Sequence, residues 1–365
     1  MKILFVVTGL YTKTGTYEVV RNTSKMLLQK HEVSLLTDVK SNIEIPFTKI
    51  IKLKTMDFLL PQYRFMPDLK KLLEDREFDQ YDIIHVFDYP LHVTDYLTRK
   101  RHQIDTPIII SLHGGLGHFN KFPFGLLKKI HDSIMLNFKN RIDLFLVSSA
   151  AEKRDAMRNG VSEEKIKILP PAMNIFPIEK QNSSRQKIVY VGRLSKTKNV
   201  EILVEAFSKI KTSNVDLIIA GPDFGMLKQL KKIAKDKGLQ NRVFFMGWIS
   251  EEEKMKLLSE TTIFVHPSLE DVFLLSLLEA GAIGIPCVAF DVGSNAEILD
   301  DNKTGIIVKD ISAQGLSEKL DLLLNDNKLY EEISRNSKLL LPKKFNWELT
   351  TKTLEEFYNY VLEKS

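Results

Sequence analysis

A basic loop in the second half of the chain holds the residues best suited to bind an anion. Residues 190–200, YVGRLSKTKNV, follow an apolar run typical of a strand and lead into a helical pattern. Gly192 lets the backbone turn at the strand end, and Arg193 and Lys198 lie five positions apart beyond it. Both cations can converge on one phosphate group, and the start of the next helix adds favourable partial charge. The loop by itself is equally compatible with a solvated basic turn.

Two carboxylates lie farther along the chain, in residues 266–293, HPSLEDVFLLSLLEAGAIGIPCVAFDVG. The pattern predicts a loop through Asp271, a helix that reaches Glu279, and a Gly-Ile-Pro turn into another strand. Carboxylates accept hydrogen bonds from hydroxyl groups, so one acid could bind a sugar and the other a ribose. The alternative is that these acids only favour the dipole at a helix start.

The surrounding elements must hold these segments in place. Short apolar runs that close on polar or glycine residues predict buried parallel strands, at 1–10, 31–38, 82–88, 107–114 and 144–149, and again at 187–194, 216–221, 243–247, 263–268, 286–291 and 305–308. Helical patterns fall between them. We therefore predict the α/β class, with two Rossmann-like, doubly wound domains that face each other across a cleft.

Prolines and a polar stretch mark the break between the two halves. Pro170, Pro171 and Pro177 precede the polar residues 179–186, and the strand pattern then restarts. We expect a first domain over 1–178, a second over 179–342, and a terminal helix within 343–365 that Trp347 anchors at its start.

Several segments, in order along nearly the whole chain, resemble the retaining GT-B glycosyltransferases of family four, the group 1 enzymes with a Glu-x7-Glu motif. VGRLSKTKN is similar to the Gly-Arg-Leu-x3-Lys diphosphate motif of that family, and residues 267–298 and 301–308 resemble its donor-binding segment and the strand that follows. Thr14-Gly15 stands at the family's Gly-Gly loop, and His113 stands at its N-domain histidine.

The resemblance implies roles for individual residues. Arg193 and Lys198 would neutralise the donor diphosphate, His113 would contact the donor sugar or its neighbourhood, and Asp271 would act at the sugar end. The residues implied in donor binding are Gly15, Gly192, Phe273, Leu274, Leu275 and Glu279.

The chain also departs from the family pattern. Asp271 replaces the first glutamate of the motif and is one methylene shorter, and Val272-Phe273-Leu274 replaces a Gly-Phe-Gly turn. Losing both glycines removes backbone freedom where the loop meets the donor. These departures leave the identity of the donor sugar open.

The resemblance implies a hexosyltransferase that moves a sugar from a nucleotide-diphosphate-sugar to a lipid-linked, glycan or small-molecule acceptor with retention of anomeric configuration. It implies that the domain over 1–178 binds the acceptor, that the domain over 179–342 binds the nucleotide-sugar, and that the terminal helix crosses back to the first domain. No metal or other cofactor is expected. The alternatives are another GT-B enzyme, such as a nucleotide-sugar epimerase or a phosphorylase, and a non-catalytic nucleotide-sugar-binding subunit.

Composition narrows the class of protein and its location. The chain has 365 residues, 44% hydrophobic and 27% charged, which argues against disorder and favours two domains. Its single cysteine, Cys287, excludes an internal disulfide and a cysteine-based metal cluster. Neither metal-ligand spacing nor a Gly-x-Gly-x-x-Gly fingerprint is evident, and we expect no nucleic acid as partner. Glu279, Gly281, Gly284 and Pro286 interrupt the longest apolar stretch, so we expect no membrane span. The single cysteine favours a reducing compartment, and we expect a cytoplasmic protein.

The excess of positive charge lies in the first half of the chain, which suggests that this half faces an anionic surface. Residues 1–178 contain 26 Lys and Arg against 20 Asp and Glu, whereas the second half is close to neutral. Residues 119–141 combine apolar positions with Lys121, Lys128, Lys129, Lys139 and Arg141. This segment fits either a helix docked on the core or an interfacial helix at the inner face of the membrane.

Overall fold

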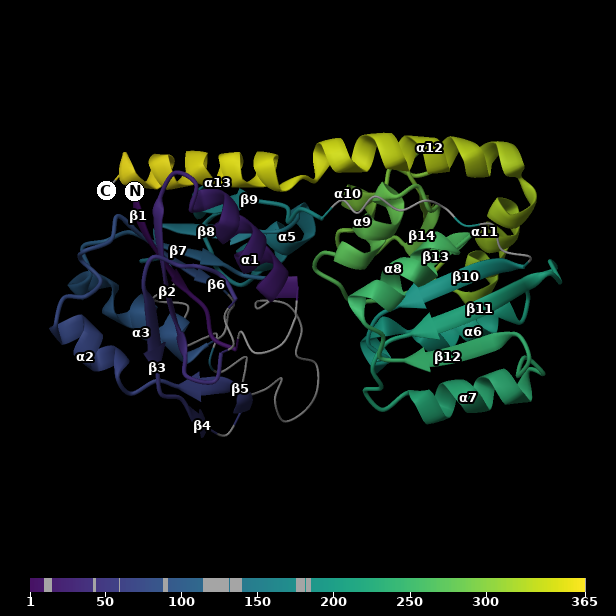
Figure 1. Ribbon diagram of the computed structural model, residues 1–365, viewed down its shortest axis with the longest axis horizontal. Coiled ribbons are helices and arrows are strands. Elements are labelled where there is room, and N and C mark those ends of the chain that lie inside the picture. The colour runs from purple at the N-terminus through teal and green to yellow at the C-terminus, as the bar shows by residue number, and fades with distance from the viewer. Residues whose placement is uncertain are drawn as a thin grey trace. The chain divides into compact units, whose positions relative to one another are not determined.

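The computed structural model describes residues 1–9, 15–41, 44–58, 60–87, 91–113, 131, 140–174, 181 and 185–364. The chain divides into two compact units, one formed by Met1–Ala172 with Trp347–Ser365 and the other by Met173–Asn346 (Figure 1). These boundaries lie a few residues from those expected at 178 and 342. The helix that contains residue 342 continues through Pro342 to Lys344, so the expected second boundary falls inside a helix.

Unit 1 is built on a parallel sheet. Its strands are β1 (Lys2–Val6), β2 (Glu32–Asp38), β3 (Ile50–Leu53), β6 (Ile83–Phe87), β7 (Ile108–Ser111), β8 (Leu144–Val147) and β9 (Ile166–Ile168). They are ordered β3-β2-β1-β6-β7-β8-β9. A separate antiparallel pair joins β4 (Met56–Phe58) to β5 (Leu60–Phe65). The helices are α1 (Gly15–Leu27), α2 (Leu69–Glu74), α3 (His92–Lys100), α5 (Ala150–Arg158), α13 (Trp347–Leu362) and the short 3₁₀ turns η1 (Arg101–Gln103) and η2 (Glu163–Lys165).

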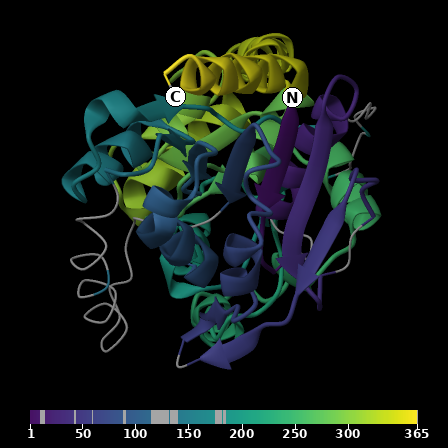
Figure 2. The same cartoon turned by 90° about the vertical axis from the view of Figure 1, so that its left-hand side faces the viewer.

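Helices cover both faces of this sheet because its strands are apolar on both sides. Successive residues of β1 alternate between two buried clusters: Ile3 and Phe5 pack with α1 and α13, whereas Leu4 and Val6 pack with α3. The terminal helix α13 begins at Trp347, as predicted, and lies along unit 1 in Figures 1 and 2. It belongs to this unit because Leu354, Tyr358 and Val361 are buried in the same cluster as Ile3.

Unit 2 has the same architecture. Its strands are β10 (Gln186–Val191), β11 (Val215–Ala220), β12 (Val243–Gly247), β13 (Ile263–His266), β14 (Cys287–Phe290) and β15 (Ile306–Val308), in the parallel order β12-β11-β10-β13-β14-β15. Around them lie η3 (Lys196–Lys198), α6 (Val200–Phe207), α7 (Leu227–Asp236), α8 (Glu251–Ser259), α9 (Leu275–Ala282), α10 (Asn295–Ile298), α11 (Ala313–Asn325) and α12 (Asn327–Lys344).

This strand order creates a switch point between β10 and β13. From β10 the chain moves outward through β11 and β12, then returns to pair β13 with the other side of β10, where Ile188 aligns with Ile263. In open α/β sheets, ligands bind outside the carboxyl ends of the strands at such a point. The loops that follow β10 and β13 are the two segments that the sequence marked as functional.

Two predictions from the sequence concern residues that lie outside the described part of the chain. Thr14 lies outside them, and so does the basic, aromatic segment 119–141 except for residues 131, 140 and 141. In the part of the chain that is described, no helix combines the length and apolar character needed to cross a membrane.

Candidate functional site

The loop after β10 carries the two predicted cations and is tightly packed at Gly192. A Cβ added to Gly192 would lie 2.6 Å from the hydroxyl of Tyr190, and a Cβ at Gly221 would lie 1.9 Å from the carbonyl oxygen of Gly192. A side chain at Gly192 would thus displace the ring of Tyr190, a side chain at Gly221 would clash with the backbone of Gly192, and Gly192 itself has no positive φ. The hydroxyl of Tyr190 donates to the carbonyl of Arg193 at 3.0 Å and holds the loop in place.

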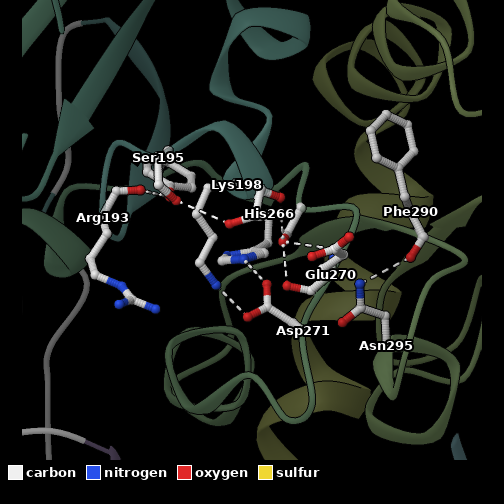
Figure 3. A network of polar contacts seen from close by, with 11 residues as sticks. Arg193, Ser195, Lys198, His266, Glu270, Asp271, Phe290 and Asn295 are labelled. Atoms are coloured by element: carbon white, nitrogen blue, oxygen red, sulfur yellow. Dashed lines mark hydrogen bonds and ion pairs between the residues drawn. The ribbon is translucent and has the colours of Figure 1, made fainter. Parts of the chain in front are cut away.

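Lys198 and Asp271 form an ion pair that joins the two loops (Figure 3). The Lys198 ammonium donates to Oδ1 of Asp271, and both side chains are largely buried. The loops are also linked through Ser268, whose hydroxyl donates to the carbonyl of Thr197 at 3.1 Å. Two predicted site residues that lie far apart in the sequence thus meet at the switch point.

His266, at the end of β13, binds the other oxygen of the same carboxylate. Its Nε2 lies 3.0 Å from Oδ2 of Asp271. Burial lowers the pKa of His266, so the imidazole is neutral and Nε2 carries the hydrogen that Asp271 accepts. The buried Nδ1 then faces no hydrogen-bond partner among the described residues. The sequence analysis did not single out His266; its position where an apolar strand ends was the available signal.

The environment keeps Asp271 ionised. Burial by itself raises the pKa of the carboxyl, but the hydrogen bond from His266 and the charge of Lys198 outweigh it and lower the pKa to about 2. Asp271 is thus a fixed negative charge that neutralises Lys198 at physiological pH.

We expect the stability of the native state to depend on pH at acid pH because of the Asp271 carboxylate. The pKa of Asp271 falls from 3.8 to about 2 on folding, so the ionised group stabilises the native state above about pH 4. Protonation removes that contribution as the pH falls from about 4 to 2. Melting temperatures of the wild type and Asp271→Asn should therefore differ by a constant amount above pH 4 and converge below it. A constant difference down to pH 2 would contradict the lowered pKa.

Arg193 is held differently from Lys198. Its side chain is exposed, and its guanidinium carbon lies 5.5 Å from the centre of the Phe224 ring. No carboxylate of the described residues forms an ion pair with it. In Figure 3 the side chains of Arg193 and Lys198 extend from their loop in the same direction. The guanidinium of Arg193 thus has no hydrogen-bond acceptor among the described residues, and its N–H groups can donate to an anion, as an anion site requires.

The remaining donor-site candidates of unit 2 lie on α9 or directly before it. Phe273 packs its ring edge-on against Phe345 at 5.7 Å, and Leu274 is buried, so these side chains serve the core. Leu275 begins α9, where the N–H groups of the first turn have no partner within the helix. Glu279 pairs with Lys254 of α8 at 2.8 Å, a partner that the sequence analysis did not foresee.

The candidates of unit 1 are His113 and Gly15. Gly15 is the first residue of α1. His113 follows β7 with a positive φ of 44°, and its ring stacks on Phe87 with centroids 6.0 Å apart. Burial lowers the pKa of His113, and its buried Nε2 lacks a partner in the described part of the chain. His113 and His85 line one small cavity of this unit, so a neutral imidazole with an open nitrogen is available there.

His85, within β6, is a buried residue with a packing role. Its Nδ1 lies 2.7 Å from the hydroxyl of Tyr358 on α13, and its Nε2 lies 2.8 Å from the hydroxyl of Ser111. Both ring nitrogens are thus used, and burial lowers its pKa to about 3.

Two protein-family models and several relatives match this chain in sequence. The family described as Glycosyltransferase Family 4 matches residues 14–175, and the family described as Glycosyl transferases group 1 matches residues 173–340. An uncharacterized glycosyltransferase of Methanocaldococcus jannaschii is 25% identical over 91% of this chain and 90% of its own length. The N-acetyl-alpha-D-glucosaminyl L-malate synthase of Bacillus anthracis is 27% identical over 50% of this chain and 47% of its own length.

Solved structures of similar fold cover the whole chain. Sucrose-phosphate synthase from Thermosynechococcus elongatus superposes with a TM-score of 0.82 at 18% identity, over 100% of both chains. HepE from Anabaena, crystallised with UDP and glucose, has a TM-score of 0.79 at 19% identity, over 99% of this chain and 100% of that one. The two family matches adjoin and together span most of the sequence. The chain therefore belongs to the group 1 glycosyltransferases and has the GT-B fold.

Proposed function

We propose that this glycosyltransferase is a retaining hexosyltransferase that uses a nucleotide-diphosphate-sugar as donor. The observation that carries the proposal is the position of Arg193 and Lys198 beside the switch point of unit 2. Two cations there suit a diphosphate. HepE of Anabaena was crystallised with UDP-glucose, which supports a donor of this class.

In the proposed reaction, the bond between the anomeric carbon and the diphosphate oxygen breaks, and its electron pair stays on the diphosphate. Arg193 and Lys198 stabilise the charge that develops on this leaving group, which is commonly the largest catalytic contribution. The acceptor hydroxyl attacks from the leaving-group face, and a diphosphate oxygen takes its proton, so the anomeric configuration is retained.

The other candidates complete the donor site in this proposal. The N–H groups of Phe273, Leu274 and Leu275 would face the donor at the start of α9, and Gly192 would let the diphosphate approach the backbone. Glu279 would bind the ribose and Asp271 would act at the sugar end. Unit 1 would bind the acceptor, with Gly15 and His113 facing the donor.

A panel of nucleotide-sugars tests the proposal. Each donor is incubated with the protein, and the products are separated by chromatography while binding is followed by thermal shift. Release of nucleoside diphosphate with transfer or hydrolysis of the sugar supports it. An isomerised sugar would instead indicate an epimerase, and binding without turnover would indicate a non-catalytic subunit. A ligand at 100 times its Kd stabilises the protein by about 2.7 kcal/mol, which such a screen detects readily.

We expect turnover to continue without a divalent metal. Arg193 and Lys198 supply the positive charge that a metal ion would otherwise provide at the diphosphate. In the described part of the chain, no group of three or more His, Cys, Asp or Glu side chains could hold a metal ion. Donor hydrolysis should therefore be unchanged after dialysis against EDTA. Complete loss that magnesium or manganese restores would contradict this expectation.

The acceptor is proposed to be a glycan, a lipid-linked molecule or a small molecule, reached at the cytoplasmic face of the membrane. Residues 119–141 carry cations that could bind an anionic membrane surface. Each Lys or Arg near such a surface contributes about 1 kcal/mol to the binding free energy. We expect the protein to sediment with phosphatidylserine-containing vesicles at low salt but not with neutral ones. Changing Lys121, Lys128 and Lys129 to Gln should release it and leave donor hydrolysis intact. A wild type that stays in the supernatant would favour a soluble acceptor.

A further inference from the structure

Phe224 is an exposed aromatic residue whose position packing does not explain. It lies in the turn Gly-Pro-Asp-Phe-Gly between β11 and α7, and 58% of its surface is exposed. A phenylalanine exposed to this extent gains little from burial. Its ring instead faces the guanidinium of Arg193 at 5.5 Å, a distance typical of a cation–π contact.

The backbone of both loops brings these two residues together. The N–H of Leu194 donates to the carbonyl of Pro222 at 2.9 Å, and the N–H of Phe224 donates to the carbonyl of Leu194 at 3.0 Å. These bonds extend the parallel pairing of β10 and β11 beyond the strand ends. Oδ1 of Asp223 accepts hydrogen bonds from the N–H groups of residues 225, 226 and 227, at 2.8 to 3.0 Å, and fixes the turn.

This contact suits an arginine that must bind an anion. A carboxylate partner, such as the one Lys198 has, offsets part of the charge of the cation and occupies one of its donors. An aromatic ring instead uses the flat face of a guanidinium and leaves the N–H groups at its edge free for bidentate contact with phosphate. An ordered guanidinium also loses less conformational freedom when the anion binds.

We infer that Phe224 is a positioning residue, which holds the guanidinium of Arg193 in the orientation that binds the diphosphate of the donor. The inference rests on the proposed function and adds to it a residue outside the predicted Gly-Arg-Leu loop. In this proposal Phe224 acts through Arg193 and not by contact with the reacting atoms.

The test compares Phe224→Leu with Phe224→Tyr, and uses Phe224→Leu with Arg193→Ala as a double variant. Phe244→Leu is the matched control, because Phe244 is an exposed phenylalanine on β12 of the same sheet. Among the described residues, Phe244 makes no cation–π contact with Arg193. Affinities for UDP, for other nucleoside diphosphates and for inorganic pyrophosphate are measured by calorimetry, and melting temperatures check folding.

We expect Phe224→Leu to weaken diphosphate binding about two- to fivefold, the strength of an exposed cation–π contact. Phe224→Tyr keeps the ring and should bind like the wild type, as should Phe244→Leu. In the Arg193→Ala background, Phe224→Leu should have no further effect, and melting temperatures should change little. A merely structural loop residue would lower the melting temperature and would still weaken binding without Arg193.

Two outcomes distinguish failure of this inference from failure of the proposed function. If the wild type binds the diphosphates but Phe224→Leu binds them equally well, or weakens binding equally with and without Arg193, the positioning role is wrong. If the wild type binds neither pyrophosphate nor any nucleoside diphosphate, the proposed donor class is wrong and the inference falls with it.

Discussion

Arg193→Ala is expected to reduce kcat about a hundredfold or more while leaving the melting temperature nearly unchanged. The residue is exposed and has no ion-pair partner among the described residues, so the fold gains little from its side chain. The developing charge on the leaving diphosphate would lose a preorganised donor, and such a loss costs about 3 kcal/mol in the transition state. Steady-state kinetics with a donor from the panel measure the effect.

A conservative variant and a control sharpen this test. Arg193→Lys keeps the charge but not the planar fork, so we expect it to recover only part of the activity. Arg185→Ala removes an arginine of the same unit that pairs with Asp216 at 2.8 Å, and should leave kcat unchanged. Turnover by Arg193→Ala that is close to wild type would show that the arginine does not act on the leaving group.

The second large effect concerns stability. Asp271→Asn should lower the free energy of unfolding by about 3 kcal/mol, because it leaves the Lys198 ammonium without its partner when only 11% of that side chain is exposed. This value is the lower end of the range for buried pairs, since Lys198 and Asp271 both retain some contact with solvent. Urea denaturation at pH 7 measures the change.

The double variant separates stability from catalysis. Lys198→Met with Asp271→Asn removes the unpaired charge and should recover most of the lost stability, while donor turnover stays low because the lysine is gone. Asp300→Asn breaks an exposed pair with Lys303, 4.0 Å apart, and should change stability by less than about 1 kcal/mol. If Asp271→Asn is as stable as the wild type, the ion pair contributes nothing to the fold.

The central strands could be predicted from the sequence because each is buried on both faces. Such strands appear as continuous apolar runs, and β1, β6 and β13 fall where those runs lie. The strands β3 and β9 were not predicted. Both lie at sheet edges and contain exposed residues, so their sequences lack a continuous apolar run.

Local sequence also located the candidate site. Gly192, Arg193 and Lys198 follow β10, and Asp271 follows β13, as predicted, because a strand end next to polar and glycine residues is a local signal. The sequence alone therefore determined where these two loops lie and which residue types they offer, and their chemical role stays a prediction. The two matching families confirm that these loops belong to a group 1 glycosyltransferase.

Only the tertiary structure decided which of these residues are partners. Lys198 and Asp271 are 73 positions apart, and they meet because β13 pairs directly with β10. The same pairing places His266 on Asp271, and the pairing of β10 with β11 on the other side places Phe224 on Arg193. Strand order is set by how whole sheets bury their apolar faces, and a local pattern contains no record of it. The sequence thus determined the donors and acceptors of the site. The order of the strands decided that Lys198 is paired with a carboxylate, whereas Arg193 has an aromatic ring beside it and no carboxylate partner among the described residues.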